Sequence, residues 1–258
     1  MTVLEVQGLS KTFGGVRAVH GVGFTLEAGE LLALIGPNGA GKTTCFNCLN
    51  GQLRPDAGSV RLLGRELVGL PPRAIWRLGV GRTFQIAQTF GSLSVAENVQ
   101  QALLSQHRRT LDLWDDARGL YRKDALALLA RVAMSEQAER PCAVLAYGDL
   151  KRVELALALA HDPRLLLMDE PTAGMALDDR LELMTLIRAL ARERDLAVLF
   201  TEHDMDVVFG HADRILVMDR GALIAEGTPA QVAADPLVRD IYLGVDGEAA
   251  SGRPVASG

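Results

Sequence analysis

Residues 36–43 read Gly-Pro-Asn-Gly-Ala-Gly-Lys-Thr, which matches the phosphate-loop pattern of spaced glycines followed by lysine and a hydroxyl residue. An apolar run at residues 31–35 precedes the loop, and a helix is expected from about Lys42. Glycines let backbone N–H groups converge on phosphate oxygens at a helix N-terminus. We predict that Lys42 binds the β- and γ-phosphates of a nucleotide and that the Thr43 hydroxyl binds Mg²⁺. The full predicted set is Gly36, Asn38, Gly39, Ala40, Gly41, Lys42, Thr43 and Thr44.

Two acidic residues follow a second apolar run, at residues 165–168. A carboxylate at the end of a buried parallel strand lies where open α/β sheets bind ligands. Asp169 is therefore predicted to hold the Mg²⁺ shell, and Glu170 to polarise the attacking water as a general base. These residues predict a phosphate-loop NTPase, which leaves kinases, GTPases, helicases and transport ATPases open.

The elements that must position these residues alternate between strand and helix at both ends of the chain. This alternation predicts a mainly parallel sheet with helices on its faces. A helical stretch in the middle interrupts the alternation and is predicted to be an inserted subdomain. Strands are expected at residues 3–9, 22–26, 31–35, 59–63, 80–84, 165–168, 197–201, 214–218 and 222–226, and helices within 94–140 and at 149–160, 177–191 and 205–211.

The predicted fold class is α/β: a phosphate-loop NTPase (RecA-like) core with an N-terminal antiparallel β subdomain and an inserted helical subdomain. We expect one ATPase domain over residues 1–245, with the helical subdomain at about 87–160, and a disordered tail at 246–258 that is rich in Gly, Ala and Ser. Cys45 and Cys48 lie in the predicted helix after the phosphate loop, with no second Cys or His pair near them. We interpret them as buried core residues.

Composition narrows the class of protein. The net charge of −5 over 258 residues argues against a nucleic-acid partner. No apolar stretch approaches the length of about 20 residues that spans a bilayer, and the N-terminus lacks the pattern of a secretory signal. We expect a cytoplasmic protein.

The sequence resembles the ABC (ATP-binding cassette) ATPases over about residues 3–243. The stretch Leu-Ala-Tyr-Gly-Asp at 145–149 is similar to the family's signature, and residues 173–176 occupy its D-loop position. Phe13 is similar to the aromatic residue that stacks on adenine, Gln85 to the Q-loop residue, and His203 to the switch histidine. The resemblance implies that Gln85 joins the Mg²⁺ shell and that His203 contacts the γ-phosphate and helps to position the water.

The resemblance also implies a head-to-tail dimer, in which ATP on one phosphate loop is covered by the signature of the partner subunit: Ala146, Tyr147 and Gly148. Two residues depart from the family pattern. Ala146 replaces the signature serine, which removes a hydroxyl contact to the γ-phosphate, and Ala176 replaces the D-loop aspartate. Slower hydrolysis and altered communication across the dimer are the expected consequences.

Within the family, five stretches resemble the ATPases of branched-chain amino-acid (LIV-type) importers, of the longer-subunit type. These stretches are residues 13–19, 81–85, 145–148, 170–176 and 242–244. The implied partners are integral-membrane permease subunits, a second ATPase subunit (self or sister) and, indirectly, a periplasmic or extracellular binding protein. The implied location is peripheral, on the inner face of the cell membrane. Another cargo (urea, amides, aromatic acids or an exported lipid), a non-transport ABC ATPase and a small-molecule kinase are the alternatives.

Overall fold

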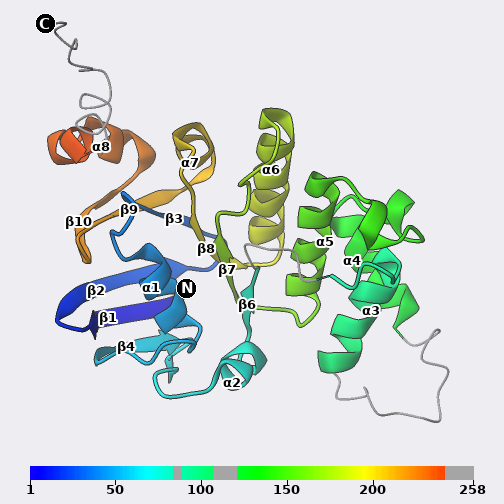
Figure 1. Cartoon of the computed structure of the whole chain (residues 1–258), viewed down its shortest axis with the longest axis horizontal. Helices are drawn as coiled ribbons and strands as arrows, with labels where there is room; N and C mark the ends of the chain where they lie inside the picture. The colour runs from blue at the N-terminus through cyan, green and yellow to red at the C-terminus, as the bar shows by residue number, and fades with distance from the viewer. Residues whose placement is uncertain (84–88, 107–120, 242–258) are drawn as a thin grey trace, which may run out of the picture.

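A six-stranded sheet forms the centre of the computed structural model, which describes residues 1–83, 89–106 and 121–241. Its strand order is β10-β9-β3-β8-β7-β6, and every neighbouring pair is parallel except β10 with β9 (Figure 1). The strands are β3 Leu31–Ile35, β6 Val80–Arg82, β7 Leu165–Asp169, β8 Ala197–Thr201, β9 Arg214–Asp219 and β10 Ala222–Gly227.

Both faces of this sheet are buried, and successive residues of β3 enter different cores. Leu31, Ala33 and Ile35 pack in one hydrophobic cluster with the helices that follow residue 94, whereas Leu32 and Leu34 pack in another. This burial explains the unbroken apolar runs in the sequence, because a parallel sheet covered on both faces has no polar side.

The second core lies between the parallel sheet and an antiparallel sheet of order β2-β1-β4-β5. Its strands are β1 Thr2–Phe13, β2 Val16–Glu27, β4 Ala57–Leu62 and β5 Arg65–Glu66. Gly14 and Gly15 connect β1 to β2 with φ angles of 52° and 87°, a conformation that glycine adopts without strain. The strands β1 and β2 are longer than the predicted segments 3–9 and 22–26, and they continue to the Gly14–Gly15 turn.

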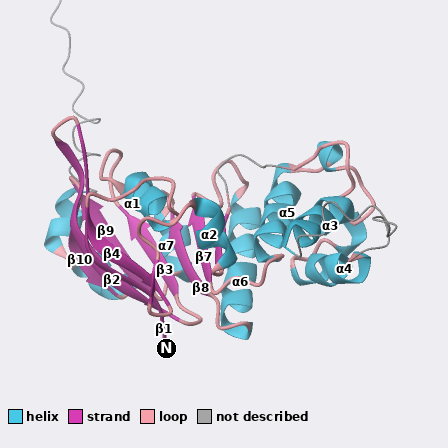
Figure 2. Ribbon diagram, turned by 90° about the horizontal axis from the view of Figure 1, so that it is seen from below, coloured by secondary structure: helices cyan, strands magenta, loops and turns pink. Residues whose placement is uncertain are grey.

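The helices are α1 Lys42–Leu49, α2 Pro72–Arg77, α3 Val95–Gln106, α4 Arg122–Arg131, α5 Tyr147–Leu159, α6 Leu177–Glu193, α7 Met205–His211 and α8 Pro229–Ala234, with 3₁₀ turns at Ser135–Gln137 and Cys142–Val144. Helices α3, α4 and α5 gather at the end of the molecule away from the antiparallel sheet (Figures 1 and 2). The predicted fold class, with its mainly parallel sheet, antiparallel β subdomain and helical part, is confirmed.

Several boundaries differ from those predicted. Helix α5 begins at Tyr147, two residues before the expected start, and α4 ends at Arg131, well before Pro141. Helices α2 and α8 were not predicted. Helix α8 nevertheless has a sequence signal, because Thr228 and Gln231 form a capping box with Pro229 between them.

Cys45 and Cys48 are buried in α1, as interpreted from the sequence. Burial raises the pKa of the Cys45 thiol to about 12 and that of Cys48 to about 11, so both are neutral core groups. None of the helices in the described ranges is long and apolar enough to cross a membrane.

Candidate functional site

The phosphate loop runs from the end of β3 to the start of α1, and two of its glycines have no room for a side chain. A Cβ atom at Gly36 would lie 2.1 Å from the carbonyl oxygen of Met218, and one at Gly41 would lie 2.1 Å from that of Ala18. Gly41 also has φ of 103° at the N-cap of α1. The loop can therefore pack this closely only with glycine at both positions.

Lys42 closes the loop from inside. Its ammonium donates hydrogen bonds to the carbonyl oxygens of Gly36 at 2.6 Å and Pro37 at 3.2 Å. Burial lowers the pKa of Lys42, and the nearby carboxylates of Glu170 and Asp169 oppose that shift. The cation is thus held at the loop by neutral carbonyls, which a phosphate can replace with a stronger, charged acceptor.

Asp169 and Glu170 lie at the carboxyl end of β7, and both form hydrogen bonds with Thr201 of β8. The Thr201 hydroxyl donates to Asp169 Oδ1 at 2.7 Å, and the Glu170 N–H lies 3.1 Å from the same hydroxyl oxygen. Arg82 on β6 adds a cation 3.8 Å from Asp169 Oδ2. Glu170 has φ of 50°, the left-handed region, which costs about 1–3 kcal/mol in a residue other than glycine.

His203 faces Glu170 across the cavity mouth, with Nε2 2.8 Å from Glu170 Oε1. The histidine side chain is half exposed and that of Glu170 is mostly covered. A cavity of about 210 Å³ connects this pair to the phosphate loop. It is lined by Ala18, Asn38, Gly39, Ala40, Gly41, Lys42, Thr43, Thr44, Asp169, Glu170 and His203. A single phosphate-sized site is therefore built from segments far apart in sequence: β2, the phosphate loop with the start of α1, the end of β7 and the residues after β8.

The cavity offers oxygen donors suited to a hard divalent cation. The Thr43 hydroxyl and the Asp169 carboxylate both line it, and Mg²⁺ prefers such ligands together with phosphate oxygens and water. No group of three or more His, Cys, Asp or Glu residues able to hold a metal occurs in the described part of the chain. The donor set fits a cation that arrives with a nucleotide.

Some predicted residues lie elsewhere. Gly36 is buried beneath the cavity, and Phe13 is 46% exposed at the end of β1, outside the cavity lining. Ala146 is the N-cap of α5, and Tyr147 and Gly148 form its first turn, also outside the cavity. Gln85 and residues 242–244 lie outside the described residues.

Comparison of the sequence with known protein families identifies the family of this chain. The model of the ABC transporter family matches residues 19–173, and a model described as "Branched-chain amino acid ATP-binding cassette transporter" matches residues 222–248. The chain belongs to the ABC transporter family. The phosphate loop, the acids after β7 and the residues at 145–148 are thus parts of an ABC ATPase.

Relatives of known description show which ABC ATPases this chain resembles. The high-affinity branched-chain amino acid transport ATP-binding protein BraF of Pseudomonas aeruginosa is 41% identical over 94% of this chain and 98% of its own length. LivG of Escherichia coli, which has the same description, is 39% identical over 94% and 98%. A solved ATP-binding cassette of an ABC transporter, in its ADP conformation, has a TM-score of 0.84 at 29% identity, covering 95% of this chain and 99% of that one. The predicted family and its branched-chain resemblance are confirmed.

As a member of this family, this ABC ATPase binds ATP and hydrolyses it to power transport.

Reasoning from the sequence missed three side chains around its site. Ala18 lines the cavity, Thr201 holds Asp169, and Arg82 lies beside the same carboxylate. Thr201 could have been found from one signal: it is a hydroxyl residue at the end of a predicted strand, as Asp169 is an acid at the end of another.

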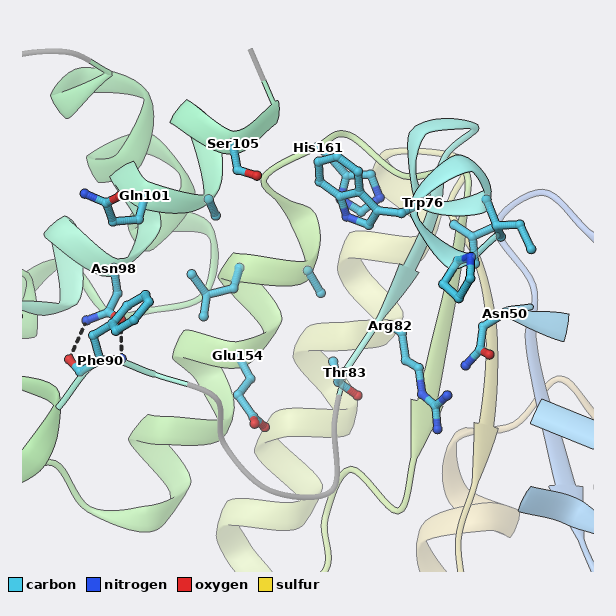
Figure 3. Close-up of a pocket in the computed structure, with 16 residues that line it drawn as sticks. Asn50, Trp76, Arg82, Thr83, Phe90, Asn98, Gln101, Ser105, Glu154 and His161 are labelled. Atoms are coloured by element: carbon cyan, nitrogen blue, oxygen red, sulfur yellow. Dashed lines mark hydrogen bonds between the residues drawn. The ribbon is translucent and has the colours of Figure 1, made fainter. Parts of the chain in front are cut away.

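A second, larger cavity of about 610 Å³ lies between α2, β6 and the helices α3 and α5 of the ABC ATPase (Figure 3). Its lining combines apolar walls with Trp76 and His161, whose ring centroids are 4.6 Å apart. Asn50 Nδ2, Glu154 Oε1 and both ring nitrogens of His161 are buried there without a hydrogen-bond partner in the described structure. Buried polar atoms are normally hydrogen-bonded, so these atoms have bonding capacity that the described residues leave unused.

Proposed function

We propose that this chain is the nucleotide-binding subunit of an importer for branched-chain or related amino acids, and that it hydrolyses Mg²⁺-bound ATP. The observation that carries the proposal is the cavity that brings the phosphate loop, Asp169, Glu170 and His203 together. The match of residues 222–248 and the names of the relatives support the cargo class.

Each side chain has a distinct task in the proposed chemistry. Lys42 leaves the carbonyls of Gly36 and Pro37 to bind the β- and γ-phosphates, while the loop N–H groups hold the remaining oxygens. Thr43 and Asp169 would hold Mg²⁺, which would supply positive charge to the phosphates. Gln85 is proposed to join that shell.

Glu170 accepts a proton from the attacking water in this proposal, and His203 orients the water and contacts the γ-phosphate. Their 2.8 Å contact places both groups at one end of the phosphate cavity. Phe13, exposed at the end of β1, is proposed to stack on the adenine, because the 210 Å³ cavity has room for phosphates but not for a whole nucleotide.

A second ATPase subunit, identical or a sister chain, completes the site in this proposal. Ala146, Tyr147 and Gly148 lie outside the phosphate cavity of their own chain, at the exposed N-terminus of α5. A helix N-terminus binds anions through free N–H groups. The signature of each subunit would therefore cover the γ-phosphate held by the other.

Permease subunits are proposed to dock in the 610 Å³ cavity, and the ATPase is proposed to lie on the inner face of the cell membrane. The unpaired atoms of Asn50, Glu154 and His161 support an occupant that offers both donors and acceptors on an apolar segment. A backbone turn of a membrane protein has that chemistry. An extracytoplasmic binding protein would act through the permease, without touching this chain.

The test uses the Glu170→Gln variant as bait. The tagged full chain is expressed in its native host, membranes are solubilised in mild detergent with Mg-ATP, and co-purifying proteins are identified. We expect two polytopic permease subunits and an ATPase partner. Recovery of ribosomal or DNA-associated proteins without a permease would overturn the transport role.

Cargo and docking each need a separate arm. The binding protein associated with the recovered permease is titrated with leucine, isoleucine and valine, and with urea, amides and aromatic acids as the alternative cargoes. Tight binding of an alternative alone contradicts the amino-acid assignment.

In the docking arm, Trp76→Ala and His161→Ala are introduced singly into the bait. Each should reduce permease recovery while nucleotide binding stays unchanged, and undiminished recovery would refute the docking site.

A further inference from the structure

The segment that links Glu170 to α6, residues 171–176, is held at its first end by a buried glutamate beside His203. Glu202 Oε1 accepts hydrogen bonds from the Thr172 N–H at 2.8 Å and the Thr172 hydroxyl at 2.7 Å. Its other oxygen accepts from the His203 N–H at 3.2 Å. Glu202 and Thr172 are 4% and 1% exposed, so water does not compete for these bonds.

The other end of the linking segment is held by a second carboxylate beside His203. Arg180 on α6 donates from Nε to the Met175 carbonyl oxygen at 2.7 Å and from Nη1 to Asp204 Oδ2 at 2.7 Å. The remaining Asp204 oxygen caps α7 by accepting from the N–H groups of Asp206 and Val207. The two acids that flank His203 in sequence therefore hold both ends of the segment 171–176: Glu202 directly at Thr172, and Asp204 through Arg180.

This arrangement accounts for the backbone of Glu170. A left-handed φ of 50° in a glutamate persists only where the surroundings impose it. The N–H of Glu170 is held from β8, and two residues later Thr172 is held by Glu202. The strained residue is thus fixed from both sides by the same stretch of chain, residues 201–204, that carries His203.

We propose that Glu202 and the Arg180–Asp204 pair are positioning residues that lock the Glu170 carboxylate against His203. The proposal rests on the roles of Glu170 and His203 given under the proposed function. Neither Glu202 nor Arg180 lines the phosphate cavity. Their loss should therefore lower turnover while leaving ATP affinity unchanged, because phosphate binding depends on the loop and turnover on the geometry of the Glu170–His203 pair.

Glu202→Gln is the sharpest variant, because the side chain keeps its shape. Three donors converge on the two oxygens of Glu202, and an amide has only one oxygen. One donor is then forced to face the amide N–H₂ group. We expect kcat for ATP to fall at least about tenfold, because a misplacement on the order of 1 Å costs about 100-fold. The ATP dissociation constant should stay close to wild type, while the melting temperature should fall by a few degrees because one buried donor loses its acceptor.

Thr172 provides a second test that keeps the carboxylate. Thr172→Val removes the hydroxyl at nearly constant volume and should lower kcat in the same way, whereas Thr172→Ser keeps the hydroxyl and should restore it to within about twofold. The double variant with Glu202→Gln should lose less than the product of the two single losses, because both changes disturb one hydrogen-bond network. Arg180→Met, which breaks the contact with Asp204, is compared with Arg192→Gln, a change at another arginine of α6 that pairs with Asp213.

The outcomes separate the two proposals. If Glu170→Gln still hydrolyses ATP at the wild-type rate, the proposed roles of the pair are wrong. If Glu170→Gln is inactive but Glu202→Gln and Thr172→Val turn over as wild type, only the positioning role is wrong. A parallel loss of ATP affinity, melting temperature and kcat, without recovery in Thr172→Ser, would assign Glu202 to folding alone and overturn the inference.

Discussion

Nε2 of His203 lies 2.8 Å from Oε1 of Glu170, although 33 residues separate them in the chain. Both side chains line the phosphate cavity together with Lys42, and the contact brings a carboxylate and an imidazole to one point. A water placed there would have an acceptor and an orienting group within reach, which is the arrangement that general-base catalysis needs.

Glu170→Gln should bind ATP, lose at least about 100-fold in kcat and accumulate as an ATP-bound dimer. The amide cannot accept the proton of the attacking water, and general-base groups typically contribute 10²–10⁴-fold. Turnover is measured by phosphate release and the dimer by light scattering after size exclusion with Mg-ATP, with and without a sister subunit. Glu182→Gln, an exposed change on α6, serves as the control. A Glu170→Gln protein that remains monomeric in both samples counts against the sandwich dimer.

Gly41→Ala should destabilise the fold by about 1–3 kcal/mol or more and abolish ATP binding. The added Cβ would meet the Ala18 carbonyl, and φ of 103° is strained for alanine. Urea unfolding and nucleotide titration measure the two effects. Gly210→Ala is the matched control at an exposed position of α7, where a Cβ meets nothing within 4 Å, and it should stabilise by about 0.5–1 kcal/mol. Equal effects of the two changes would be inconsistent with the close packing of the loop.

Ala146→Ser and Ala176→Ser should each stabilise the chain by about 1 kcal/mol. Both alanines are N-caps, of α5 and α6, with extended backbone and no side-chain cap, so a serine hydroxyl can accept from the free N–H groups of the first turn. The free energy of unfolding is measured in urea. Ala127→Ser, in the exposed interior of α4, should instead be slightly destabilising. If all three serines destabilise alike, the helix ends differ from those described.

His161 should make the fold sensitive to mild acid. Burial lowers its pKa from 6.5 to about 4, against a smaller opposing contribution from the nearby Asp162 carboxylate. Between these pH values the unfolded chain therefore binds more protons than the folded chain. The contribution of neutral His161 to stability is full above pH 6.5 and is lost as the pH falls towards 4 and below. The loss is on the order of 3 kcal/mol. Urea unfolding from pH 7 to 4 should show a shallower dependence in His161→Gln but not in the exposed control His20→Gln. An unchanged pH dependence in His161→Gln would contradict this assignment.

The sequence by itself determined the chemistry that is local in the chain. A buried strand, a glycine loop, Lys42 and a helix are consecutive, and the acids come directly after another apolar run. Backbone conformation and phosphate binding there depend on neighbours within about ten residues, so residue type and spacing were sufficient to predict both the loop and the parallel core.

The tertiary structure alone decided which side chains meet these acids. Strand β8 pairs with β7 in a register that sets Thr201 opposite Asp169, and this pairing brings Glu202 to Thr172 and His203 to Glu170. Strand order and register depend on how whole sheets and helices pack, because each apolar strand fits several neighbours equally well by composition. The local pattern therefore named Glu170 and the family resemblance named His203, and the packing of two parallel strands brings the two side chains into contact.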